Sequence, residues 1–278
     1  MKKKIIWAAF GVTMAVIVGI ASWFAVIAVP QLRGKGVRYE TTKLWDKGDV
    51  KMIAHRGLSG ILLENTAPAF ELAGQKSYYG IEADVHVTKD GKFIIVHDDD
   101  LERIAGLDMC IEETDYDTLR ALRFKDVYGD SEEENMYLPS LDEYVAICKK
   151  YDKQAILELK KKMEPHEVSG IAKAVEDSGW FNRTTFISFS GENLVELRKV
   201  YPQADAQYLV EEATEEEIQF MIDNRFDADL RWDCVKTNVV ERLHNAGLKV
   251  NCWTVDGKEC ARMMKKCGVD YITSNILE

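Results

Sequence analysis

Two acidic residues alternate with apolar residues in the stretch Gly80-Ile81-Glu82-Ala83-Asp84-Val85. In a β-strand this alternation places Glu82 and Asp84 on one face, and the apolar residues on the other face indicate that the strand is buried. Two ionised carboxylates on one buried face repel each other and lose hydration, which is costly unless a positive charge compensates. A divalent cation is the simplest compensation.

Short apolar runs of the same kind recur along the chain and alternate with helical patterns. The predicted strands are 52–54, 81–85, 155–159, 185–189, 206–210, 228–232, 249–254 and 271–273. The predicted helices are 67–75, 141–151, 166–178, 192–200, 214–224, 236–245 and 258–267. Several strands are apolar throughout, as in a parallel sheet that is buried on both faces.

Eight such strands with helical crossovers predict a (β/α)8 TIM barrel, whose usual size is roughly 250 residues. An open doubly wound sheet is the competing topology, but no Gly-x-Gly-x-x-Gly follows the first strand. A further strand-like run at 92–96 follows Asp90-Gly91. Because Asp-Gly is a strong hairpin signal, we expect this run to form a hairpin with the second strand.

Other ionisable residues also fall where predicted strands end. His55 and Arg56 follow the first strand, His97 follows the hairpin, and Glu158 and Lys160 lie two residues apart at the end of the third strand. In a parallel barrel all of them reach the carboxyl-terminal rim, where the active site of this architecture is built. Glu158 would supply a third oxygen ligand, and a set made only of carboxylates favours Ca²⁺ or Mg²⁺ over zinc.

These residues lie in motifs that occur in a fixed order. The motifs are His55-Arg56-Gly57, Glu64-Asn65-Thr66, Glu82-Ala83-Asp84-Val85, Thr88-Lys89-Asp90-Gly91, His97-Asp98, Glu158-Leu159-Lys160, Ser188-Phe189 and Trp253-Thr254. Together they resemble the glycerophosphodiester phosphodiesterase family, from about Met52 to the C-terminus. Independently of this likeness, Glu64-Asn65-Thr66 precedes Ala67-Pro68 and predicts a helix start that Asn65 or Thr66 caps.

The resemblance implies a (β/α)8 barrel and the hydrolysis of glycerophosphodiesters to glycerol 3-phosphate and an alcohol. It implies the metal ligands Glu82, Asp84 and Glu158, the general acid/base pair His55 and His97, the phosphate-binding cations Arg56 and Lys160, and the apolar substrate wall Phe189 and Trp253. One departure concerns the last strand, where Thr273-Ser274-Asn275 replaces the more usual Thr-Asp. That change puts hydrogen bonding at this part of the rim in doubt.

Several alternatives remain open. Attack by a glycerol 2-hydroxyl to give a cyclic phosphate and direct attack by water both fit the proposed groups. A lipid phosphodiesterase similar to lysophospholipase D or sphingomyelinase D is a second reading of the same site. A non-catalytic, membrane-anchored binding protein is a third, but costly ionisable groups cluster at functional sites, which favours an enzyme.

The N-terminus carries a separate signal. Three lysines at 2–4 precede an uncharged, mostly apolar segment from Ile5 to Val29. At about 1.5 Å per residue this length crosses a hydrocarbon core of about 30 Å. Because a signal peptide has a shorter apolar core, we expect an uncleaved single-pass anchor in the cell membrane, with cleavage after Val26-Ile27-Ala28 as the alternative.

The expected organisation is a transmembrane anchor at 1–30, a juxtamembrane linker at 31–49 and the catalytic barrel at 50–278. The basic N-terminus favours an extracytoplasmic barrel, although basic residues after the span oppose this orientation. The formal net charge of -11 argues against a nucleic-acid partner. We therefore expect a small-molecule or lipid-derived phosphodiester substrate and a membrane contact through the N-terminal helix.

Cys148 and Cys252 lie in apolar runs and are expected to be buried thiols.

Overall fold

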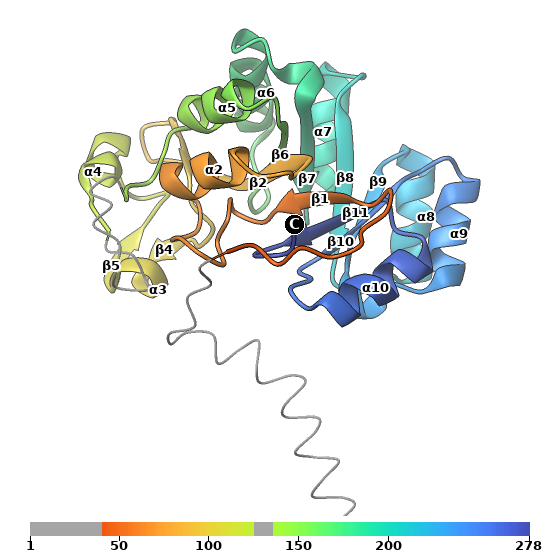
Figure 1. Cartoon of the computed structure of the whole chain (residues 1–278). Helices are drawn as coiled ribbons and strands as arrows, with labels where there is room; N and C mark the ends of the chain where they lie inside the picture. Colours follow the sequence, from red (N-terminus) through yellow and green to blue (C-terminus); the bar gives the residue numbers. More distant parts are fainter. Residues whose placement is uncertain (1–40, 125–135) are drawn as a thin grey trace, which may run out of the picture. The chain divides into compact units, whose positions relative to one another are not determined.

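The computed structural model of the chain describes residues 41–124 and 136–278, and these form a parallel β-barrel surrounded by helices (Figure 1). The barrel closes because the first strand pairs in parallel with both the second and the last. Its eight strands are β1 (Lys51–Ala54), β2 (Gly80–Val87), β6 (Gln154–Leu159), β7 (Thr184–Ser188), β8 (Asp205–Val210), β9 (Asp227–Arg231), β10 (Val250–Trp253) and β11 (Tyr271–Ser274). The predicted barrel is confirmed.

The helices that connect these strands begin and end close to the predicted residues. They are α2 (Ala67–Gly74), α5 (Leu141–Lys150), α6 (Pro165–Asp177), α7 (Gly191–Val200), α8 (Glu215–Asn224), α9 (Thr237–Asn245) and α10 (Lys258–Cys267). Local capping explains the agreement, since Thr66 caps α2 as one of the two predicted candidates, and Ser140 caps α5 within a capping box.

Three predicted strands end one residue too late, at Phe189, Trp232 and Thr254, and two of these residues are aromatic. Phe189 follows the end of β7, and Trp232 begins a short 3₁₀ helix, η3 (Trp232–Cys234). Both residues are aromatic and continue the apolar run of their strands, so periodicity alone did not separate them from the strand. Another 3₁₀ helix, η2 (Phe181–Arg183), precedes β7.

The chain leaves the barrel between β2 and α5. As predicted, β3 (Phe93–Ile95) pairs antiparallel with β2. It is followed by β4 (Asp100–Leu101), α3 (Glu102–Ala105), β5 (Leu107–Cys110) and α4 (Tyr116–Ala121), which lie to one side of the barrel in Figure 1. These four elements were not predicted, because segments of two to six residues are too short to display a helical or strand period.

Apolar side chains fill the barrel beneath the rim. Ile53, Ile156, Ile187, Leu209 and Tyr271 form one buried cluster. Ile156 lies two residues before Glu158 on β6, so the two side chains share the inner face of the strand. The polar residues at the carboxyl ends of the strands therefore lie above an apolar layer. Cys148 and Cys252 are buried, as predicted.

The predicted anchor, residues 1–30, lies outside the described residues. Within 41–124 and 136–278, each helix is too short or too polar to span a bilayer. The structure describes the predicted linker from residue 41 onward. There Lys43 forms an isolated parallel β-bridge with Leu277, which follows β11.

Candidate active site

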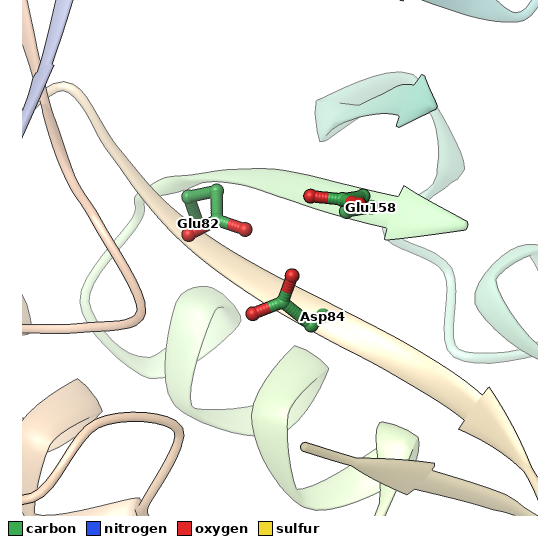
Figure 2. Close-up of side chains that lie close together, drawn as sticks. All are labelled: Glu82, Asp84 and Glu158. Carbon is green, nitrogen blue, oxygen red and sulfur yellow. The ribbon is translucent and has the colours of Figure 1, made fainter. Parts of the chain in front are cut away.

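Three carboxylates converge at the carboxyl ends of β2 and β6. Glu82 and Asp84 project from β2, and Asp84 is paired in register with Glu158 of the neighbouring β6. One oxygen of each carboxylate lies within 4.8 Å of the others, and all three side chains are buried. Figure 2 shows them facing a common space. The structure thus brings together the three residues expected to bind a metal ion.

The electrostatics of this cluster fit a bound cation. Burial, reinforced by the neighbouring Asp84, raises the pKa of Glu82 well above its usual value. The same two causes raise the pKa of Glu158 to about 7. Among the described residues, Asp84 Oδ1 has no hydrogen-bond partner although it is buried. An oxygen-only set with excess negative charge, in which one buried oxygen accepts no hydrogen bond from any described residue, is suited to a hard divalent ion.

The two cations predicted to bind phosphate lie against the carboxylates. Lys160 Nζ is 2.8 Å from Glu158 Oε1 and 3.4 Å from Asp84 Oδ1. Arg56 Nε is 3.4 Å from Asp84 Oδ2, and the Arg56 backbone N–H donates to Glu82 Oε2 at 2.7 Å. Burial opposes ionisation of Asp84, but Arg56 and Lys160 hold the pKa of this carboxyl well below its usual range. These cations therefore favour the charged form of Asp84, whereas the raised pKa values of Glu82 and Glu158 favour their protonated forms when no metal ion is bound.

Asn65 supports the cluster in a way that the sequence analysis did not foresee. Its side-chain amide donates to Asp84 Oδ2 at 2.7 Å. Asn65 has a positive φ of 53°, as does Arg56, and a left-handed backbone at a non-glycine residue is a local strain that is common at functional sites. Because Thr66 caps α2, Asn65 is available to orient the carboxylate. The signal was present in Glu64-Asn65-Thr66, where only a helix cap was predicted.

His55 is held by an amide. Its Nδ1 lies 2.8 Å from Asn275 Oδ1, while the Asn275 Nδ2 group and backbone N–H both donate to Asp256. Since Asp256 accepts from the amide nitrogen, the Asn275 oxygen faces His55, which must donate from Nδ1 and present Nε2 as an acceptor. Burial, with the nearby Arg56, lowers the pKa of His55 to about 4. Asn275, at the departure from the family pattern, therefore retains a rim hydrogen bond.

His97 is held by a carboxylate instead. Its Nδ1 is 2.6 Å from Asp98 Oδ1, and the other Asp98 oxygen accepts from Arg103 Nε at 2.6 Å. Arg103 also donates to both oxygens of Glu64, which in turn accepts from Arg56 Nη1 at 2.8 Å. Arg103 belongs to α3, one of the short elements between β3 and α5 that were not predicted. Through Arg103, the segment between β3 and α5 thus links the Asp98 carboxylate that holds His97 to the Glu64 carboxylate that holds Arg56.

A cavity of about 200 Å³ lies beside these groups. Of the predicted site residues, its lining includes His55, Arg56, Glu82, His97, Glu158, Phe189 and Trp253. Asp84 and Lys160 do not line the cavity themselves. Asp84 contacts the lining residue Arg56, and Lys160 contacts the lining residue Glu158. The Phe189 and Trp253 rings meet edge to face with centroids 5.4 Å apart, and both residues line the cavity. The remaining lining consists of Ile187, Leu209, Glu211, Asp229 and Thr273.

Asp229 was also missed. It lies in β9 between Ala228 and Leu230, which are both fully buried. A carboxylate inside an apolar strand is the same signal that singled out Glu82 and Asp84. The predicted strand, 228–232, began one residue too late and left out Asp227, so the acidic pair that Asp227 and Asp229 form on one face was overlooked.

Comparisons with known proteins agree with this geometry. A model of the Glycerophosphoryl diester phosphodiesterase family matches residues 55–277. The glycerophosphodiester phosphodiesterase of Caldanaerobacter subterraneus subsp. tengcongensis is 26% identical over 227 residues, which are 81% of this chain and 93% of that protein.

Two solved structures are similar over a comparable length. An Oleispira antarctica phosphodiesterase in complex with the product sn-glycerol-3-phosphate has a TM-score of 0.76 and 26% identity, and the match covers 81% of this chain and 93% of that one. A glycerophosphodiester phosphodiesterase from Parabacteroides distasonis has a TM-score of 0.68 and 26% identity, covering 82% and 93% of the two chains.

Proposed function

The chain belongs to the glycerophosphoryl diester phosphodiesterase family, and we propose that it hydrolyses glycerophosphodiesters to glycerol 3-phosphate and an alcohol at the rim of its barrel. The observation that carries this proposal is that two imidazoles, a guanidinium and two of the three clustered buried carboxylates line one cavity. No single pair among these groups would suffice.

Glu82, Asp84 and Glu158 would hold one divalent cation, Ca²⁺ or Mg²⁺. When bound, this ion would polarise a phosphoryl oxygen and compensate the charge of the carboxylates. Arg56 lines the cavity beside the cluster, and Lys160 contacts two of the carboxylates. Both cations are positioned to offset the negative charge that develops on the phosphorus oxygens.

The partners of the two histidines favour different roles. Burial, with the nearby Arg56, lowers the pKa of His55 to about 4 and leaves the imidazole uncharged near neutral pH, so His55 Nε2 is suited to accept a proton from the attacking hydroxyl. Burial lowers the pKa of His97, and the Asp98 carboxylate opposes this shift by stabilising the imidazolium, so His97 is suited to donate a proton to the leaving alkoxide as the phosphorus–oxygen bond breaks. The proton taken by one imidazole is thereby balanced by the proton given by the other. The same assignment serves attack by water or by a glycerol 2-hydroxyl.

The size of the cavity bears on the substrate. At about 200 Å³ it is smaller than the roughly 300–1,000 Å³ of sites that enclose a whole drug-sized ligand. We therefore propose that it encloses the glycerophosphoryl part and leaves the alcohol toward the open rim, where Phe189 is 43% exposed. Product bound in the similar Oleispira antarctica enzyme supports a small glycerol phosphate as the enclosed group.

The test is an assay of the purified full chain on glycerophosphocholine, glycerophosphoethanolamine and lysophosphatidylcholine. The expected result is release of glycerol 3-phosphate from the first two, loss of activity in EDTA and recovery with Ca²⁺ or Mg²⁺. Activity on lysophosphatidylcholine alone would support the lipid phosphodiesterase instead. Activity that persists after complete removal of divalent ions would overturn the metal-dependent mechanism.

We also propose that residues 1–30 anchor the enzyme in the cell membrane with the barrel on the extracytoplasmic side. The uncharged segment from Ile5 to Val29 and the lysines before it support this arrangement. Protease added to intact cells is expected to degrade the barrel while the membrane stays sealed. Protection of the barrel in intact cells would mean that the barrel lies on the cytoplasmic side. Release of the protein from membranes by high salt would contradict a transmembrane anchor.

A further inference from the structure

We propose that Asp229 is a specificity residue of this site, and that its side chain forms a hydrogen bond with a hydroxyl of the glycerol moiety of the substrate. The inference rests on the proposed function and deepens it. The motifs that identify the site assign no role to this residue, because none of them lies on β8 or β9, between Ser188-Phe189 at β7 and Trp253-Thr254 at β10.

The position of Asp229 places it inside the barrel. It is paired in register with Leu209 of β8 and Asn251 of β10, and Leu209 belongs to the apolar cluster that fills the barrel. Asp229 lines the cavity together with His55, Glu158 and Thr273. The Trp253 indole N–H donates to the Asp229 backbone carbonyl at 3.2 Å, which fixes the aromatic wall directly beside this strand.

The hydrogen bonding of Asp229 is incomplete. Asn251 forms a side-chain hydrogen bond with the carboxyl. Oδ1, however, is buried without a hydrogen-bond partner in the part of the chain that the structure describes. A buried polar atom left unpaired costs roughly 1–3 kcal/mol, so such atoms are rare and call for an explanation. An oxygen on the wall of a substrate cavity has a ready explanation, because the ligand can supply the missing partner.

A purely structural role explains the arrangement less well. Buried polar side chains are as a rule satisfied by their neighbours, as Asn251 and Thr273 satisfy each other. Gln207 of β8 offers an internal comparison, since its Oε1 is also buried and unpaired among the described residues, but Gln207 does not line the cavity. Of these two oxygens, only that of Asp229 belongs to the wall of the substrate site.

The chemistry of the carboxyl selects the ligand group. Burial raises the pKa of Asp229 to about 8, so near neutral pH this side chain carries a proton and can both donate and accept. An alcohol hydroxyl matches a group of this kind, whereas an ammonium group would need an ionised carboxylate. Glycerol esterified at a terminal carbon carries hydroxyls on the next two carbons of its chain, close to the phosphate that the charged groups bind.

A hydroxyl-binding group also gives selectivity. A site built to hydrogen bond a substrate hydroxyl rejects an analogue without it strongly, because its own buried group is then left unpaired. Asp229 would therefore select glycerophosphodiesters against phosphodiesters of simple alkyl alcohols.

The experiment compares the binding of glycerol 3-phosphate with that of propyl phosphate, which lacks both hydroxyls, by calorimetry on the full chain. The wild-type protein is expected to bind glycerol 3-phosphate about tenfold or more tightly than propyl phosphate. In Asp229→Leu, which is close in shape, this ratio is expected to fall to about one with the affinity for propyl phosphate nearly unchanged. Gln207→Met is the matched control and is expected to keep the wild-type ratio.

A second variant covers the case in which the leucine protein does not fold. Asp229→Asn keeps a donor and an acceptor, so it is expected to retain part of the ratio and to remain active. Equal ratios in wild type and Asp229→Leu would overturn the inference, as would a folded Asp229→Asn that loses its affinity for both ligands equally. If wild type hydrolyses glycerophosphodiesters but binds both ligands alike, only the role of Asp229 fails. If it neither binds nor hydrolyses them, the proposed function fails.

Discussion

The two sides of the cavity are built on different principles. The charged wall consists of His55, Arg56, Glu82, His97 and Glu158, with Asp84 and Lys160 behind them. The apolar wall consists of Ile187, Phe189, Leu209 and Trp253 with the buried carboxyl of Asp229 among them, and the exposed Glu211 and the buried Thr273 complete the lining. Hydrogen bonds and ion pairs fix nearly every functional group of the charged wall, whereas the apolar wall is held mainly by packing.

This difference separates chemistry from recognition. Asn65, Asp98 and Asn275 each orient one group of the charged wall through a bond of 2.6 to 2.8 Å. Such preorganisation is what catalysis requires, since the groups are in place before the reaction begins. The apolar wall places aromatic surface and a single unpaired oxygen against the substrate. We therefore expect changes to the charged wall to lower kcat and changes to the apolar wall to alter KM and selectivity.

The largest effect is expected from the carboxylates. Asp84→Asn and Glu158→Gln keep the side-chain shape but remove a charge that the cation requires. Several kcal/mol of transition-state stabilisation would be lost, so kcat should fall by about 10³-fold or more. Steady-state hydrolysis of glycerophosphocholine with saturating Ca²⁺ or Mg²⁺ measures the loss. In EDTA, Glu158→Gln should melt at or above the wild-type temperature, because burial and Asp84 raise the pKa of Glu158 and disfavour its charge. Asp84→Asn should melt lower, because it removes the charge that pairs with Arg56 and Lys160. Near-normal kcat in both variants would contradict the assignment.

A smaller loss is expected at the histidines. His55→Ala and His97→Ala should each lower kcat by about 10²–10⁴-fold, the usual range for a general acid or base. Their roles can be separated with a 4-nitrophenyl phosphodiester, whose leaving group needs no protonation. On that substrate His97→Ala should recover much of its activity and His55→Ala should not. The reverse pattern would exchange the two roles. His166→Ala, on the exposed face of α6, is the control and should behave as wild type.

The carboxyl of the apolar wall predicts a dependence of stability on pH. The pKa of Asp229 is raised to about 8 in the folded protein, so between the unfolded value and pH 8 the folded state holds a proton that the unfolded state has released. This contribution to stability is present at low pH and is lost as pH rises, by at most about 1.4 kcal/mol per pH unit. Urea denaturation in EDTA at pH 5, 6.5 and 8 should show wild type losing stability relative to Asp229→Asn. Parallel profiles would mean that the carboxyl is not buried in its neutral form.

The smallest effect is expected at the exposed edge of the apolar wall. Phe189 is 43% exposed, so Phe189→Ala removes only part of a contact and should raise KM by about fivefold with kcat unchanged. Met263→Ala on α10 is the control, since Met263 is exposed to a similar degree and does not line the cavity. A fall in kcat without a change in KM would place Phe189 among the groups that act on the transition state.

The contrast between the walls also explains what could be predicted from the sequence. Glu82, Asp84 and Glu158 stand in apolar strands, where a charge is costly and therefore conspicuous. Eight apolar runs with capped helices between them specified the barrel. Phe189 and Trp253 carried no such signal, because aromatic residues at strand ends are usually core, and their roles came only from the family resemblance.

The supporting residues were harder to predict for a physical reason. Arg103 reaches Asp98 and Glu64 from a helix of four residues, too short to show a period. Asn275 contacts His55 across 220 positions of sequence, and only closure of the barrel brings them together. Asp229 carried a signal of the right kind, a carboxylate in an apolar strand, but the predicted strand began after Asp227, so the pair of acidic residues was not recognised.

The central claim is that three carboxylates from two strands hold one divalent ion. Titration calorimetry of EDTA-treated wild-type protein with Ca²⁺ and with Mg²⁺ tests it most directly, with Asp84→Asn beside it. We expect one ion bound per chain in wild type, for at least one of the two metals, and no binding of that metal to folded Asp84→Asn under the same conditions. Equal binding by the two proteins, or no binding by wild type, would contradict the account.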